Sequence, residues 1–134
     1  MNLDVAVTTI MTSNVECVSR EQKLVDIKHI YERPDFHSHI PVLENDKVVG
    51  IVSLVNFMRA IHDASLDDNE RVYQELKVGE IMTPNPVSVS SKATIRDAVQ
   101  ILSNGEFHSL LVTENDKLSG IISTTDLMKN LLLD

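Results

Sequence analysis

The residues of this chain best suited to chemistry are Ser123 and Asp126, three positions apart and directly after a short apolar run. A carboxylate fixed at the start of a helix can accept hydrogen bonds from both hydroxyls of a ribose, and Ser123 can hydrogen-bond beside it. The free N–H groups of a helix N-terminus also attract phosphate. The same spacing forms a capping box, in which both side chains only satisfy backbone N–H groups. Both interpretations predict a helix that begins at Ser123.

The five histidines could bind phosphate or a metal ion. His37 and His39 are two residues apart, on the same side of an extended chain. A third ligand would have to come from His29, His62 or His108. No zinc motif such as His-Glu-x-x-His is present, and the single Cys17 excludes a cysteine-based cluster. We therefore expect pocket-lining or structural histidines and no metal site.

Signatures of catalysis are absent from the sequence. The only glycines are Gly50, Gly79, Gly105 and Gly120, so neither a Gly-x-Gly-x-x-Gly turn nor a Walker loop can form. There is no Gly-x-Ser-x-Gly elbow, and nothing marks two carboxylates as a general acid–base pair. We predict that the chain is not an enzyme and holds no resident cofactor.

Composition narrows the class of partner. The 134 residues are 43% hydrophobic, which supports a real core, and 4% aromatic, which predicts a core of aliphatic side chains and methionine. A net charge of −8 without a basic stripe argues against nucleic acid. The N-terminus lacks a signal peptide, and no apolar run approaches the roughly 20 residues that span a bilayer. We expect a cytoplasmic protein without a membrane or nucleic-acid partner.

An internal repeat organises the chain and positions these residues. Ile-Met-Thr at 10–12 recurs at 81–83, an offset of 71. Glu-Asn-Asp-Lys at 44–47 and Gly-Ile-Val-Ser at 50–53 recur at an offset of 70, as 114–117 and 120–123. The order and spacing of these matches indicate a duplication, with a gap of one residue between the two blocks.

Each copy predicts the element order β-α-β-β-α. In the second copy, apolar residues at helical spacing predict an amphipathic helix: Ile95, Ala98, Val99 and Leu102. In the first copy, Ser19 and Gln22 predict a capping box at the start of the equivalent helix. Two short apolar strands follow around the polar Glu-Asn-Asp-Lys turn, and a second helix begins at Ser53 or Ser123. Four methionines occupy duplicated positions and are predicted to be packing residues rather than part of a cofactor site: Met11, Met58, Met82 and Met128.

The fold class predicted is therefore α+β, with two repeats packed pseudo-symmetrically into one module. We place the first repeat at 1–62 and the second at 77–134. Residues 63–76 are acidic and contain neither glycine nor proline. They are interpreted as a solvated helical linker rather than an acidic binding segment.

These motifs resemble the CBS repeat (the cystathionine-β-synthase type), whose tandem pair is often called a Bateman module. Three pieces carry the resemblance: Ile-Met-Thr at each repeat start, His39-Ile40-Pro41-Val42, and Gly-hydrophobic-hydrophobic-Ser-x-x-Asp before the last helix. The resemblance covers residues 7–60 and 78–130. It implies clefts between the repeats that bind adenosine-containing ligands such as AMP, ADP, ATP or S-adenosylmethionine, association as a homodimer, and signalling to another protein.

The resemblance implies one nucleotide site, centred on Asp126. Its other members would be Thr12, His37, Ser38, His108, Ile121, Ser123 and Thr125. His108 stands where relatives often carry a phosphate-binding arginine, and an imidazole is mostly neutral at pH 7. This difference favours AMP or S-adenosylmethionine over ATP. The first repeat carries Asn56 in place of the aspartate, so we expect its cleft to be degenerate.

The function predicted is a regulatory module that senses an adenosine-containing ligand in the cleft between the repeats. The chain stops shortly after the second repeat, so the signal would pass to a separate regulated protein that the sequence does not name. The alternative is a ligand-free protein-interaction or dimerisation domain. Asp126 separates the two hypotheses, because in the alternative it is only a helix cap.

Overall fold

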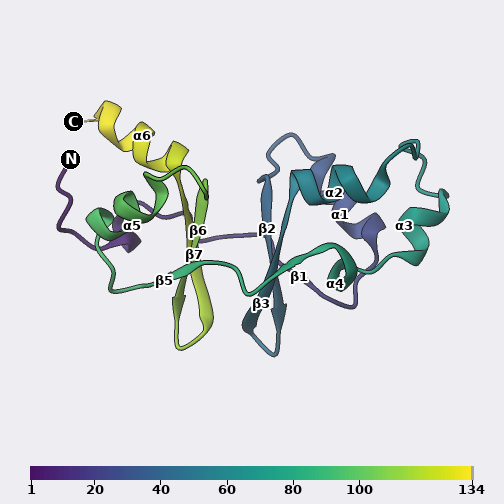
Figure 1. Ribbon diagram of the computed structural model, residues 1–134, viewed down its shortest axis with the longest axis horizontal. Helices are drawn as coiled ribbons and strands as arrows, with labels where there is room; N and C mark the ends of the chain where they lie inside the picture. Colours follow the sequence, from purple (N-terminus) through teal and green to yellow (C-terminus); the bar gives the residue numbers. More distant parts are fainter. Residues whose placement is uncertain (134) are drawn as a thin grey trace. The chain divides into compact units, whose positions relative to one another are not determined.

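The computed structural model describes residues 1–133 and divides them into two compact units. One unit consists of residues 1–15 with the segment from Pro86 onward, and we call it the Asp126 unit. The other consists of Glu16–Asn85, and we call it the Asn56 unit. In each unit the helices lie to one side of a central β-hairpin (Figure 1). The mixed helix and sheet content is the predicted α+β class.

The Asn56 unit contains the first hairpin and the whole acidic segment 63–76 (Figure 1). Its elements are β1 (Val18–Ser19), α1 (Leu24–Tyr31), β2 (His39–Glu44), β3 (Lys47–Ser53), α2 (Leu54–Ile61), α3 (Arg71–Glu75), α4 (Val78–Ile81) and β4 (Thr83–Pro84). β1 pairs parallel with β2, β2 antiparallel with β3, and β3 antiparallel with β4.

The Asp126 unit repeats this plan. Its elements are the 3-10 turn η1 (Val7–Thr9), β5 (Ser88–Ser90), α5 (Ile95–Leu102), β6 (Ser109–Glu114), β7 (Lys117–Ser123) and α6 (Thr124–Leu133). β5 pairs parallel with β6, and β6 pairs antiparallel with β7. Thr12 bridges to Ile121 as Thr83 pairs with Ile51. The predicted order β-α-β-β-α is thus present in both units.

The compact units differ from the repeat boundaries at 1–62 and 77–134. The N-terminal fifteen residues lie with the second repeat, and the segment up to Asn85 lies with the first. The hydrogen bonds explain the exchange: Val7 N donates to Ala93 O at 2.8 Å, and Val78 N donates to Gln22 O at 2.8 Å. Each Ile-Met-Thr segment therefore completes the unit formed by the other copy.

The Glu-Asn-Asp-Lys turns are two-residue hairpin loops. Asn45 and Asp46 have φ of 52° and 66°, and Asn115 and Asp116 have φ of 53° and 66°. Positive φ at both central residues matches the right-handed twist of the flanking strands, and Asn and Asp tolerate this conformation. The turns fix the register of both hairpins, so that Glu44 pairs with Lys47 and Glu114 with Lys117.

The capping box predicted from Ser19 and Gln22 is wrong as a helix start. Gln22 Oε1 does accept a hydrogen bond from Ser19 N at 2.7 Å, but α1 begins at Leu24 with Lys23 as N-cap. The N–H of Leu24 instead donates to Leu76 O at 2.8 Å, because the segment before α4 lies across the helix start. A backbone carbonyl distant in sequence replaces the local cap.

Each unit has its own hydrophobic core. The Asp126 unit buries aliphatic side chains only, whereas the Asn56 unit adds the aromatic residues Phe57 and Tyr73. The ring centroids of these two lie 6.5 Å apart, and Tyr73 is completely buried. The predicted packing role is confirmed for Met11 and Met82, which lie against the two cores. It is wrong for Met58 and Met128, whose side chains are 58% and 61% exposed. They lie on the outer faces of α2 and α6, where no element of their own unit covers them.

The acidic segment 63–76 is helical only over Arg71–Glu75. The side chain of Tyr73 anchors this short helix in the core, and its hydroxyl donates to Ser65 O at 2.6 Å. The preceding loop is fixed by its own side chains, among them Asp67, whose carboxylate accepts a hydrogen bond from Asn69 N at 2.9 Å. The segment is thus an integral part of the Asn56 unit and not only a solvated extension.

Candidate functional site

Asp126 is held at the start of α6 by a reciprocal pair of hydrogen bonds with Ser123. Asp126 N donates to Ser123 Oγ at 3.1 Å, and Ser123 N donates to Asp126 Oδ2 at 2.8 Å. Both residues are half-buried. The capping box occupies only Oδ2, and within residues 1–133 no protein group donates to Oδ1. The cap therefore orients the carboxylate and leaves one oxygen available to accept hydrogen bonds from a ligand.

The segment that follows η1 reaches the end of β7 through Thr12. Thr12 N donates to Ile121 O and Ile121 N donates to Thr12 O, both at 2.9 Å. A Cβ on the adjacent Gly120 would stand 2.6 Å from Thr12 O and 2.7 Å from the sulfur of Met11. Glycine is required there because two backbones meet too closely for any side chain. Two of the duplicated motifs, Met-Thr and Gly-Ile, are thus direct structural partners.

His108 lies next to the start of α6. Its backbone carbonyl accepts a hydrogen bond from Thr124 N at 3.0 Å, while its imidazole is exposed to solvent. Thr125, one residue before Asp126, is exposed as well. Six of the eight predicted site residues therefore belong to the Asp126 unit: Thr12, His108, Ile121, Ser123, Thr125 and Asp126.

The other two predicted site residues, His37 and Ser38, belong to the Asn56 unit. Ser38 O accepts hydrogen bonds from Leu54 N at 2.8 Å and from Tyr31 Oη at 3.0 Å, and the His37 side chain is exposed. In their own unit they stand next to the start of α2, as His108 stands next to the start of α6. That His37 and Ser38 share a site with Asp126 stays a prediction.

The start of α2 shows the same capping geometry with a different side chain. Asn56 N donates to Ser53 Oγ at 3.0 Å, and Ser53 N donates to Asn56 Oδ1 at 2.9 Å. Because a backbone N–H can only donate, the amide oxygen must face it, and the Nδ2 group is left as the outward atom. Asn56 thus presents a donor where Asp126 presents an acceptor. At this position of the helix start, the Asn56 side chain therefore offers no outward acceptor.

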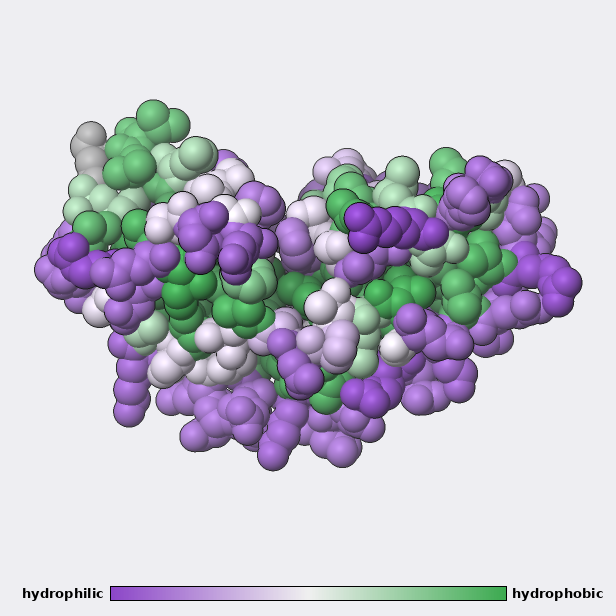
Figure 2. All heavy atoms as spheres, viewed as in Figure 1, coloured by the Kyte–Doolittle hydropathy of each residue, from purple (hydrophilic) through white to green (hydrophobic). Residues whose placement is uncertain are grey.

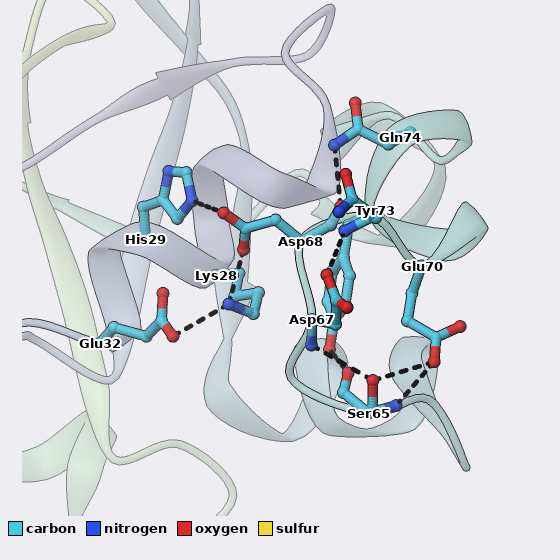
Figure 3. A network of polar contacts seen from close by, with 10 residues as sticks. Lys28, His29, Glu32, Ser65, Asp67, Asp68, Glu70, Tyr73 and Gln74 are labelled. Atoms are coloured by element: carbon cyan, nitrogen blue, oxygen red, sulfur yellow. Dashed lines mark hydrogen bonds and ion pairs between the residues drawn. The ribbon is translucent and has the colours of Figure 1, made fainter.

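A second polar cluster, in the Asn56 unit, surrounds Lys28 (Figure 3). Lys28 is only 3% exposed, and its Nζ donates to Asp68 Oδ1 at 2.7 Å and to Glu32 Oε2 at 2.9 Å. His29 Nε2 lies 2.8 Å from Asp68 Oδ2. The hydrogen bonds with Lys28 and His29 hold the pKa of Asp68 below its ordinary value, and those with Asp68 and Glu32 raise the pKa of Lys28.

Sequence reasoning missed this cluster because residues 63–76 were interpreted as solvated. One signal was present: Lys28 is four residues after Leu24 and three before Tyr31, on the apolar stripe of α1. A lysine at such a position is almost never fully buried unless a carboxylate is paired with it. The partner Asp68 lies 40 residues away in the chain, so periodicity alone could not identify it.

Comparison with known proteins identifies the family. The CBS domain family matches residues 7–63 and 78–133, and the chain belongs to this family. It is 32% identical over 130 residues to the uncharacterized protein MJ1232 of Methanocaldococcus jannaschii, covering 94% of this chain. The chain spans only 38% of the length of that relative.

Two similar solved structures of CBS pairs are complexes with adenosine compounds. CBSX2 of Arabidopsis thaliana in complex with AMP is 24% identical, with a TM-score of 0.79 over 96% of this chain and 97% of that one. The CBS pair of protein MJ0100, in complex with 5′-methylthioadenosine and S-adenosyl-L-methionine, is 15% identical, with a TM-score of 0.77 over 96% of each chain. These likenesses establish the fold of a CBS pair over nearly the whole chain.

CBS pairs are regulatory modules and generally not catalysts, which agrees with the missing enzyme signatures. In the part of the chain that the structure describes, no helix combines the length and the apolar character needed to span a membrane.

Proposed function

We propose that this CBS pair is a regulatory module that binds an adenosine-containing ligand through Asp126. The observation that carries the proposal is the free Oδ1 of a carboxylate oriented by Ser123 at the start of α6. The ribose 2′- and 3′-hydroxyls would donate to this oxygen, and the exposed hydroxyl of Thr125 would lie next to them. The helix N-terminus adds a favourable potential for negative charge on the ligand.

The ligands of the two related complexes support adenosine as the recognised part. AMP carries a phosphate, whereas 5′-methylthioadenosine carries none, and the adenosine group is what they share. A carboxylate that accepts from the ribose suits this shared part. Near the start of α6, His108 offers an imidazole instead of a permanent cation, so we propose AMP or S-adenosylmethionine in preference to ATP.

Ligand binding is tested by thermal shift and calorimetry with AMP, ADP, ATP, S-adenosylmethionine and NAD. The decisive variant is Asp126→Asn, because Asn56 shows that asparagine keeps the capping box while replacing the outward acceptor by a donor. A ligand at about 100 times its dissociation constant should stabilise the wild type by roughly 2.7 kcal/mol. We expect no such stabilisation of Asp126→Asn, and equal melting temperatures of the two proteins without ligand.

The matched control is Asn56→Ala, which should retain binding because it changes the equivalent position of the other unit. A panel in which no adenosine compound stabilises the wild type would reject the proposal. Binding that is equal in the wild type and Asp126→Asn would reject the role of Asp126.

We further propose that the protein is a homodimer that passes its signal to a separate protein. The support is apolar surface on α2 and on α6: Val55 and Met58 on the first, Met128 and Leu131 on the second, are each more than half exposed. Figure 2 shows hydrophobic atoms gathered over α6. Exposed apolar side chains of this kind favour burial against another protein. Light scattering of the wild type and of Met128→Glu tests it, with a dimer expected only for the wild type.

The exposed apolar faces also favour a second candidate, a ligand-free interaction domain. In that case the ligand panel gives no shift, while Met128→Glu still disrupts the dimer. A regulatory switch requires more: the ligand must bind one arrangement of the dimer better than the other. A change in the sedimentation coefficient on addition of the ligand would separate the switch from the passive domain.

A further inference from the structure

We propose a binding site for a zinc-like divalent metal ion at His29, Glu32 and Asp68 in the Asn56 unit. One ligand atom from each residue lies within 4.8 Å of the other two. In Figure 3 the imidazole of His29 and the ammonium of Lys28 both point at the Asp68 carboxylate, and the Glu32 carboxylate points at the same ammonium. The sequence places His29 among five histidines without a motif, and only the fold gives it carboxylate partners.

The backbone positions all three ligands. His29 lies in the last turn of α1 and Glu32 is its C-cap, three residues later and still in helical conformation, so the two side chains lie on the same face. Asp68 comes from the loop, and its carbonyl accepts a hydrogen bond from Gln74 Nε2 at 2.9 Å, which ties the loop to α3. His29 and Glu32 are exposed and Asp68 is half-exposed, so an ion could reach them from solvent. Three protein ligands would leave a fourth position of a tetrahedral ion for water.

The cluster already holds a positive charge at this point. The ammonium of Lys28 lies 2.7 Å from Asp68 Oδ1 and 2.9 Å from Glu32 Oε2, between two of the proposed ligands. Its long side chain has a second stabilising contact, since Nζ lies 5.6 Å from the centre of the Tyr73 ring. A divalent ion would interact with the same two carboxylates with twice the charge, and it would compete with Lys28 for them.

The mixture of ligands selects the class of ion. Magnesium and calcium are bound by oxygen atoms, whereas an imidazole together with carboxylates suits zinc and its neighbours in the first transition row. With zinc–nitrogen and zinc–oxygen bonds of about 2.0–2.2 Å, the three side chains would have to adjust around the ion. His29 Nε2 and Asp68 Oδ2 lie 2.8 Å apart, at hydrogen-bond distance, and an ion bound to both would replace that hydrogen bond.

The Asp126 unit lacks the site. At the offset of 71, His29 and Glu32 correspond to Gln100 and Ser103, neither of which offers an imidazole or a carboxylate. Within residues 1–133 the cluster therefore occurs once, and a stoichiometry of one zinc ion per chain is expected.

The test is isothermal calorimetry with Zn²⁺ on the whole chain and four variants. We expect one ion per chain for the wild type, and a loss of affinity of at least about tenfold for His29→Ala and for Asp68→Asn. His62→Ala is the matched control, because His62 is exposed and lies 3.5 Å from Asp63 in the same unit without belonging to the cluster. This control should bind zinc as the wild type does.

Lys28→Met is the most discriminating variant. It removes the competing ammonium while keeping an apolar stem of similar length, so its affinity for zinc should equal or exceed that of the wild type. Circular dichroism confirms that each variant is folded. The proposal is overturned if the wild type binds no zinc, if His29→Ala binds as tightly as the wild type, or if Lys28→Met loses affinity while folded. None of these outcomes depends on whether an adenosine ligand binds at Asp126.

Discussion

The Asp126 unit and the Asn56 unit begin their last helices in the same way and offer a ligand opposite groups. In both, a serine and the residue three positions later exchange two hydrogen bonds, at 2.8 and 3.1 Å in one and 2.9 and 3.0 Å in the other. The free atom is a carboxylate oxygen in the first and an amide nitrogen in the second. The structural role of the residue is thus the same in both units, whereas the outward atom is an acceptor in one and a donor in the other.

The units also differ in what covers their first helix. In the Asp126 unit, residues before η1 reach α5, where Val5 O accepts a hydrogen bond from Ile95 N at 2.9 Å. In the Asn56 unit, the same place is taken by Leu76 and is extended by α3 and the acidic loop. The additional segment brings the buried Tyr73 and the ion pair of Asp68 with Lys28, neither of which has a counterpart among the described residues of the other unit.

The largest change in stability is expected for a variant that tests whether α3 is part of the core of the Asn56 unit. Tyr73→Ala removes a fully buried aromatic ring and should lower the free energy of unfolding by about 3–5 kcal/mol. Urea denaturation measures it, with Leu66→Ala as the control, since Leu66 belongs to the same segment and is exposed. A loss below about 1 kcal/mol for Tyr73→Ala would mean that the segment is dispensable.

A reciprocal exchange sharpens the comparison of the two helix starts. Asp126→Asn should abolish adenosine binding, and the double variant Asp126→Asn/Asn56→Asp tests whether the carboxylate alone restores it in the other unit. We expect no restoration or only weak binding, since Leu54 and Val55 replace the hydroxyls of Thr124 and Thr125. Calorimetric stoichiometry gives the answer, and restored affinity equal to the wild type would contradict the importance of the threonines.

The two serine caps should be equivalent in stability. Ser53→Ala and Ser123→Ala each remove the acceptor for one N–H group of a helix start, and each should cost about 1 kcal/mol. Thermal unfolding of the two variants, without ligand, measures both. A much larger loss for one serine would show that the two caps differ in their surroundings despite their matching hydrogen bonds.

The smallest effect concerns the pH dependence of the Asn56 unit. Because the folded-state pKa of Asp68 lies below its ordinary value, the carboxylate stabilises the fold above that ordinary value, and the contribution is lost as the pH falls through the lowered pKa. The wild type should thus melt higher than Asp68→Asn at pH 7, and the difference should shrink toward pH 3. A difference that is the same at both pH values would exclude ionisation as its cause.

Much of the fold could be predicted from local sequence patterns. The Glu-Asn-Asp-Lys turns, the strands around them and the helices starting after Ser53 and Ser123 are set by short-range rules: alternation, turn chemistry and capping. The part of the candidate site at the start of α6 could be predicted in the same way, because Ser123, Thr125 and Asp126 lie within four consecutive residues. The mistaken helix start at Ser19 shows the limit, because there a carbonyl from Leu76 replaced the local cap.

By itself, the sequence determined the duplication, the α+β class, the CBS family likeness and the asymmetry of aspartate and asparagine. The tertiary structure decided which Ile-Met-Thr segment completes which unit, that Met58 and Met128 face outward, and that Asp68 neutralises the buried Lys28. The physical reason is the separation of the interacting residues along the sequence. Hydrogen bonding within a turn depends on residues three or four apart, whereas backbone contact at Gly120 and charge pairing at Lys28 depend on residues brought together only by folding.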